Sequence, residues 1–145
     1  MIPSFDEDGN IPPGIHDASW DEISARFGST AHRLALLDGL DRALDSLHGA
    51  GCRRAYLDGS FVTAKEQPGD FDACWEIQGV EADLLDPVLL GFDDLRAAQK
   101  AKFGGELFPA ELGADPHGTT FLHFFQRAKN TGNPKGIIGM NLGDL

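Results

Sequence analysis

The sequence is short of basic residues, and this shortage excludes one class of protein. Only 12 Lys and Arg face 23 Asp and Glu, so the formal net charge is -11. A protein that holds a nucleic-acid backbone by bulk electrostatics needs the opposite balance or a local basic patch. The basic residues are scattered along the chain, so extended nucleic acid is not expected as a partner.

Cysteine is equally scarce. Cys52 and Cys74 are the only two, with no CxxC spacing and no cluster of His and Cys. A disulfide framework or a structural zinc site needs more such residues at shorter spacing. Both side chains are therefore expected to be buried free thiols.

Long apolar runs are missing as well. No stretch approaches the roughly 18 apolar residues of a membrane span, and the first ten residues, MIPSFDEDGN, are acidic where a signal peptide is basic and then apolar. We expect a cytoplasmic protein with no membrane partner.

The composition that remains is that of an ordinary folded domain. With 145 residues, 41% hydrophobic and 24% charged, the chain is long enough for one core and too short for two comfortable ones. We predict a single domain over residues 1–145. Residues 1–18 hold three prolines and two glycines, which predicts an extended N-terminal arm without regular structure of its own.

Hydrophobic periodicity and turn signals predict the elements that follow the arm. A capping box of Ser19 and Glu22 opens a short helix that Gly28 ends. The remaining elements are a helix from about Ala31 to Gly51, strands in 52–59 and 71–77, a helical stretch in 79–103 interrupted at Pro87 and restarted at Asp93 or Asp94, a strand in 105–110, a helix in 119–129 and a final strand in 131–142. This order predicts an α+β (mixed α/β) fold in which helices flank a small sheet.

Two aspartates at the start of the 71–77 strand carry the main functional signal. Asp70 and Asp72 project to the same side of an extended chain and could share a hard divalent cation, Mg²⁺ or Mn²⁺. Gly59 and Ser60 end the preceding strand, where a residue without a side chain lets a phosphate approach backbone N–H groups. Metal beside a phosphate cradle is what nucleotidyl or phosphoryl transfer requires. The alternative is an acidic, half-exposed strand next to an ordinary turn.

Gly59-Ser60, nine further residues and Asp70-Phe71-Asp72 with apolar flanks resemble the signature of the DNA polymerase beta type nucleotidyltransferase superfamily, particularly its minimal stand-alone members. In that family the Gly-Ser turn contacts the nucleotide phosphates and the carboxylates bind magnesium. The resemblance implies these roles for Gly59, Ser60, Asp70 and Asp72. It covers about residues 53–77 and the helix before them, and the rest of the chain looks like a bacterial group within or beside that superfamily.

The same resemblance implies a third carboxylate on a later strand, where it would be both metal ligand and general base. Glu106 opens the predicted strand in 105–110 and is our choice, with Glu76 as the alternative. Lys65 is the only cation in the loop before Asp70 and is the candidate phosphate contact. Lys135 is a second candidate if the C-terminal turn folds over the site, but a solvated hairpin tip is the preferred interpretation. Asp58 departs from the family pattern, which has an apolar residue before the glycine.

The aromatic stripe in 121–125 is helical in spacing and not interleaved with cations. It predicts core packing in preference to a platform for stacked bases.

These observations predict a magnesium-dependent nucleotidyltransferase that transfers a nucleoside monophosphate from a nucleoside triphosphate to a hydroxyl of a protein, a small molecule or an RNA end. The acidic composition favours a protein or small-molecule acceptor, and a homodimer would be one way to complete a site on so small a chain. One alternative is a catalytically inactive relative that binds a protein partner, as toxin-antitoxin modules do by analogy. Another is a metal-binding protein that ignores triphosphates.

Overall fold

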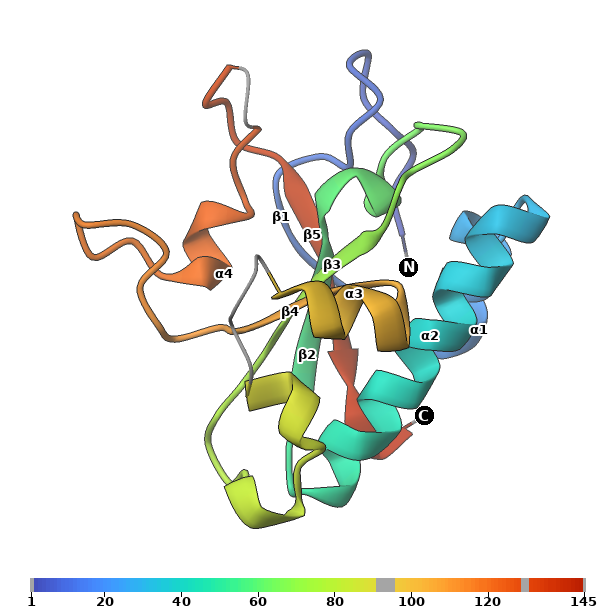
Figure 1. Ribbon diagram of the computed structural model, residues 1–145. Coiled ribbons are helices and arrows are strands. Elements are labelled where there is room, and N and C mark those ends of the chain that lie inside the picture. Colours follow the sequence, from blue (N-terminus) through green and yellow to red (C-terminus); the bar gives the residue numbers. More distant parts are fainter. Residues whose placement is uncertain (1, 91–95, 129–130, 145) are drawn as a thin grey trace.

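The computed structural model describes residues 2–90, 96–128 and 131–144, and it shows a five-stranded mixed sheet with helices on both faces (Figure 1). The strands are β1 (Gly14–Asp17), β2 (Arg54–Asp58), β3 (Phe71–Trp75), β4 (Gly105–Pro109) and β5 (Gly136–Asn141). The helices are α1 (Trp20–Phe27), α2 (Ala31–Gly49), α3 (Ala97–Phe103) and α4 (Phe121–Phe124). The predicted α+β fold with a helix-flanked sheet is confirmed.

The sheet has the strand order β1-β5-β2-β3-β4. Strand β2 lies at its centre and pairs antiparallel with both β3 and β5, whereas β1 runs parallel to β5 and β4 runs parallel to β3. The N-terminal ends of β3 and β4 therefore lie beside the C-terminal end of β2. The candidate residues Gly59, Ser60, Asp70, Asp72 and Glu106 lie at or next to these strand ends.

Two unequal cores lie on opposite faces of the sheet. The larger core packs α1, α2 and α3 against one face, and its α2 contribution includes Leu37, Leu40, Leu44 and Leu47, the stripe expected of an amphipathic helix. The smaller core packs α4 and its neighbours over Tyr56, Cys74 and Phe108 on the other face. Successive residues of a strand alternate between these faces.

The local signals at the helix starts are confirmed. The Ser19 hydroxyl accepts a hydrogen bond from the backbone N–H of Glu22 at 3.2 Å, and the Glu22 carboxylate accepts one from the Ser19 N–H, so α1 begins with the predicted capping box. Thr30 caps α2 through the N–H of Arg33. Both thiols are buried and free, as expected.

Three expectations differ from the structure. Residues 14–17 of the arm form strand β1, because the neighbouring strand β5 satisfies their backbone groups. The stretch 79–103 contains two short 3₁₀ segments, Ala82–Leu84 and Pro87–Leu90, before α3; the expected restart at Asp93 or Asp94 lies outside the described residues. The aromatic helix is a single turn, α4.

The arm otherwise lies along the domain. Its chain contacts the rest through backbone hydrogen bonds, among them Ala64 N–H to the Gly9 carbonyl at 2.8 Å and Gly136 N–H to the Ile11 carbonyl at 2.8 Å. Within the described part of the chain, none of the helices has the length and apolar character needed to cross a membrane.

Candidate metal and nucleotide site

Three acidic residues form a row across three adjacent strands. The strand register places Asp58 of β2 opposite Asp72 of β3, and Asp72 opposite Glu106 of β4. Residues paired directly across strands share a face, with Cβ atoms about 5 Å apart, and like charges in such pairs are destabilising. A row of three carboxyl groups therefore costs stability unless nearby positive charge or protonation offsets the repulsion.

Asp70 joins this row from the turn before β3. Carboxylate oxygens of Asp70, Asp72 and Glu106 all lie within 4.8 Å of one another, and the three side chains are half-buried. Hard divalent cations such as Mg²⁺ take oxygen ligands of this kind. The structure thus brings together Asp70, Asp72 and Glu106, the three carboxylates predicted from the sequence, although Glu106 lies more than thirty residues after the two aspartates.

The glycine turn fits closely against this cluster. Gly59 has φ +76°, and a Cβ atom built there would lie 3.0 Å from both Cβ and Cγ of Asp72 and closer still to its Oδ2. Left-handed backbone and a neighbour at this distance both require glycine. The short 3₁₀ segment Gly59–Val62 begins at this residue, so bare backbone lies directly beside the carboxylates.

A buried arginine fixes the loop that follows. Arg33 of α2 is 3% exposed. Its guanidinium donates hydrogen bonds to the Phe61 carbonyl at 2.8 Å, to the Thr63 carbonyl at 3.1 Å and to the Lys65 carbonyl. Five donors in a planar fork suit such a set of carbonyls. Desolvation lowers the pKa of Arg33 from its usual range. The arginine therefore positions the segment that carries Gly59 and Ser60, and nothing in the local sequence signals this role.

Asp58, the member of the row on β2, is completely buried. Burial and the charge of Asp72 raise the pKa of the Asp58 carboxyl well above its ordinary value, while a hydrogen bond from the Cys74 thiol and the charge of Lys135 act in the opposite direction. The Cys74 Sγ donates to Asp58 Oδ2 at 3.5 Å, and Oδ1 has no hydrogen-bond partner among the described residues. The desolvation cost outweighs the opposing contributions, because an isolated buried charge is expensive.

Two cations of the α3 region pair with the third carboxylate. Arg96 Nη1 lies 3.2 Å from one oxygen of Glu106, and Lys100 Nζ lies 3.2 Å from the other. The hydrogen bond and charge of Glu106, with smaller contributions from Asp70 and Asp72, raise the pKa of Lys100. Arg96 has φ +60° and stacks over the Phe108 ring at 4.2 Å, an unfavourable backbone conformation. These ion pairs offset part of the negative charge of the cluster.

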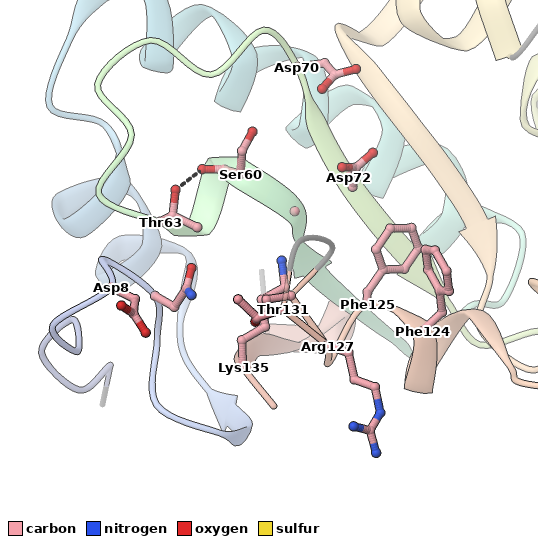
Figure 2. Close-up of a pocket in the computed structure, with 13 residues that line it drawn as sticks. Asp8, Ser60, Thr63, Asp70, Asp72, Phe124, Phe125, Arg127, Thr131 and Lys135 are labelled. Atoms are coloured by element: carbon pink, nitrogen blue, oxygen red, sulfur yellow. Dashed lines mark hydrogen bonds between the residues drawn. The ribbon is translucent and has the colours of Figure 1, made fainter. Parts of the chain in front are cut away.

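A cavity of about 480 Å³ opens next to the acidic cluster (Figure 2). Gly59, Ser60, Asp70 and Asp72 line one side of it, and the other side is lined by Phe124, Phe125, Arg127, Ala128, Thr131 and Lys135. Its size falls in the range of small-ligand sites, roughly 300–1,000 Å³. Carboxylates, bare backbone, aromatic rings and a lysine therefore face one another across a space that a nucleotide could fill.

The remaining candidates, Lys65, Glu76 and Lys135, differ in whether they line the cavity next to the acidic cluster. Lys65 lines a separate hollow with Phe5 and Arg26, so the structure does not bring it to the cluster. Glu76, which directly follows the end of β3, instead accepts a hydrogen bond from the Tyr56 hydroxyl at 2.6 Å. Lys135, for which a solvated hairpin tip was the preferred interpretation, lines the cavity. Only the long-range packing of β5 beside β2 reveals that position.

The aromatic stripe is partly core and partly cavity wall. Phe121 and Phe125 pack with Phe108, at ring-centroid distances of 4.5 and 5.1 Å from it, as predicted. Phe124 instead remains 39% exposed and lines the cavity together with Phe125. The sequence of a one-turn helix does not indicate which of its aromatic side chains face the core and which face the cavity.

Comparison with known protein families gives a match over nearly the whole chain. Residues 3–141 match the model of a family described as a family of unknown function, DUF6932. No curated protein and no solved structure matches the chain. Because the match spans nearly the whole sequence, the chain belongs to the DUF6932 family.

Proposed function

We propose that this protein is a magnesium- or manganese-dependent nucleotidyltransferase of the polymerase beta type, which transfers a nucleoside monophosphate from a nucleoside triphosphate to a hydroxyl group. The observation that carries the proposal is the convergence of Asp70, Asp72 and Glu106 beside the glycine turn at Gly59. The cavity next to them supports it, because it is large enough for a nucleotide.

The donor set fits the metal. Three half-buried carboxylates with oxygens within 4.8 Å of one another offer the all-oxygen environment that Mg²⁺ and Mn²⁺ prefer. The close approach of Gly59 to Asp72 leaves backbone, and not a side chain, next to the place where the metal would lie. Bound there by Asp70, Asp72 and Glu106, the ion would neutralise phosphate charge and polarise the phosphoryl group.

The chain's own residues would supply binding and orientation. The backbone at Gly59 and the hydroxyl of Ser60 would donate hydrogen bonds to phosphate oxygens, and Lys135 would add positive charge from the opposite wall. In the transfer, the acceptor hydroxyl oxygen bonds to the α-phosphorus and the bond from that phosphorus to the pyrophosphate oxygen breaks. The hydroxyl proton passes to a carboxylate oxygen of the cluster, and pyrophosphate leaves. The acceptor would be a protein side chain, a small molecule or an RNA end.

A transfer screen tests the proposal. Each nucleoside triphosphate labelled at the α-phosphate is incubated with Mn²⁺ or Mg²⁺, the protein and panels of protein, small-molecule and RNA acceptors. Labelled product and released pyrophosphate are expected for the wild type. The variant Asp70→Asn/Asp72→Asn should lose both, whereas Asp38→Asn/Asp83→Asn, which removes two exposed carboxylates, should not. Equal activity in the two double variants would reject the assigned site.

A second candidate is a catalytically inactive module of the same fold that binds a protein partner. The observation that favours it is the pairing of Glu106 with Arg96 and Lys100, since an internal cation pair already offsets part of the charge that a metal would neutralise. In that case neither metal nor triphosphate would bind detectably. Binding measurements therefore separate the two candidates before any acceptor is known.

A further inference from the structure

The exposed ring of Phe124 is the feature of the cavity that phosphate and metal binding leave unexplained. Its side chain is 39% exposed and lines the cavity opposite the strand that carries Asp70 and Asp72. Figure 2 shows Phe124 and Phe125 side by side at the cavity wall near Asp72. Leaving an aromatic ring in contact with water forgoes the burial that the neighbouring rings achieve.

The ring is held rigidly in that place. Phe124 meets Phe125 edge to face, with centroids 5.3 Å apart and an interplanar angle of 87°. Phe125 is 7% exposed and packs in turn on Phe108. The single turn of α4 is fixed by the Thr120 cap on the His123 N–H, and by backbone hydrogen bonds from Phe121 to Leu112 and from Leu122 to Ala110. A ring fixed from behind and open in front loses little entropy when a flat ligand stacks on it.

The same wall of the cavity also carries two cationic residues, Arg127 and Lys135. The Arg127 guanidinium donates to the Gly132 carbonyl at 3.1 Å and points away from the acidic pair (Figure 2). Lys135 lies on the same wall of the cavity, and its charge lowers the pKa of the Asp58 carboxyl. The wall therefore carries cationic side chains as well as the aromatic ring of Phe124.

We infer that Phe124 forms a subsite for the flat heterocycle of the ligand, so that the base of a nucleoside triphosphate adds to binding in addition to its phosphates. This inference rests on the proposed function. It makes the ligand a nucleotide and not a simple polyphosphate, and it gives a role to the exposed ring of Phe124. Stacking on an aromatic side chain tolerates any base, so the subsite need not choose among the four.

Matched ligands and variants test the subsite by titration in the presence of Mg²⁺. The four nucleoside triphosphates are compared with ribose 5-triphosphate, which lacks only the base. For the wild type we expect at least one nucleoside triphosphate to bind roughly 5- to 100-fold more tightly than ribose 5-triphosphate. Phe124→Leu should abolish this preference and leave the affinity for ribose 5-triphosphate unchanged. Phe124→Trp should keep the preference, as should the control Leu84→Ala at an exposed position outside the cavity.

The outcomes separate the subsite from the site. Equal affinities for the two ligand classes in the wild type would overturn the subsite and leave the proposed nucleotidyltransferase site standing. An equal loss of both affinities in Phe124→Leu would also overturn it, because the ring would then only support the fold. If neither class binds to the wild type at millimolar concentration, the proposed function fails and the subsite fails with it.

Discussion

Gly59 is the residue at which the backbone comes closest to the acidic cluster. Substitution Gly59→Ala places a Cβ against Asp72 and forces a non-glycine residue to φ +76°. We expect a loss of at least about 1–2 kcal/mol in the free energy of unfolding from the backbone conformation alone, with a marked loss of Mn²⁺ affinity as Asp72 is displaced.

Gly69→Ala is the matched control, because a Cβ at Gly69 meets no atom within 4 Å and its φ is not left-handed. Urea unfolding and Mn²⁺ titration of the two variants check the prediction. Equal behaviour of both glycines would mean that the turn at Gly59 is not tied to the metal ligands.

Asp58 belongs to the row of carboxyl groups but not to the proposed metal site. Its raised pKa means that the folded protein keeps the Asp58 proton above the ordinary value of 3.8, where the unfolded chain releases it. The folded state then binds more protons than the unfolded state, so this residue makes the free energy of unfolding fall as the pH rises above about 4. Asp58→Asn removes that dependence.

We therefore expect Asp58→Asn to gain stability relative to the wild type between pH 4 and pH 7, as measured by urea unfolding at both values. A wild type that instead gains relative stability over this interval would show that Asp58 is ionised and paired in the folded protein. The buried neighbour Cys74, whose thiol donates to Asp58, is unchanged in both proteins.

At the scale of the element, α3 supplies positive charge to the third carboxylate. Lys100 pairs with Glu106, and Lys102, which lies on the same helix, pairs with Asp86. Because Lys100 also interacts with Asp70 and Asp72, Lys100→Met should raise the affinity for Mn²⁺ alone severalfold, more so at low salt.

Lys102→Met removes the same charge from the same helix and should leave that affinity nearly unchanged. Electron paramagnetic resonance of free and bound Mn²⁺ measures both. Weaker Mn²⁺ binding in Lys100→Met would show that the lysine supports the metal site and does not compete with the metal.

Helix α2 holds the glycine loop through one side chain. Arg33→Met leaves the carbonyls of Phe61 and Thr63 without their buried donor, and we expect a loss of roughly 2–4 kcal/mol in the free energy of unfolding. Arg42→Met on the same helix breaks only an exposed pair with Asp38, which should cost less than about 1 kcal/mol. Thermal or urea unfolding of the two variants compares them, and similar losses would contradict the positioning role of Arg33.

The elements also show where sequence reasoning is reliable. The capping box at Ser19, the leucine stripe of α2 and the turns before β3 and β4 are local, so the helices and strands that they start could be predicted. Strand β1 could not, because it exists only through pairing with β5, more than a hundred residues later. The short helix α4 is fixed by hydrogen bonds to the segment after β4, which no local pattern reveals.

At the scale of the whole molecule, the sheet order decides which residues meet. Asp70 and Asp72 were identifiable because they are neighbours in the chain, and Glu106 because the family resemblance implies a third carboxylate on a later strand. The position of Lys135 depends on β5 entering the sheet beside β2, and that of Phe124 on the hydrogen bonds between α4 and the segment after β4. Lys65 lines a different hollow, and its carbonyl accepts a hydrogen bond from Arg33. The residues of the wall that carries Lys135 and Phe124 therefore depend on long-range packing, whereas Asp70 and Asp72 could be predicted from the local sequence.

The whole chain also sets the electrostatic conditions of binding. With a net charge of -11, the protein repels a free triphosphate, and few cations face the cavity to offset this. Divalent metal should therefore be needed for any triphosphate to bind. Acceptors that are long polyanions are disfavoured for the same reason.

The most direct measurement is calorimetric titration of each of the four ribonucleoside triphosphates into the protein, with and without Mg²⁺, beside the Asp70→Asn/Asp72→Asn variant. We predict that at least one triphosphate binds the wild type only when Mg²⁺ is present and does not bind the variant. Absence of binding at millimolar concentration, or binding that is the same without metal and in the variant, would contradict a metal-dependent nucleotide site on this sheet.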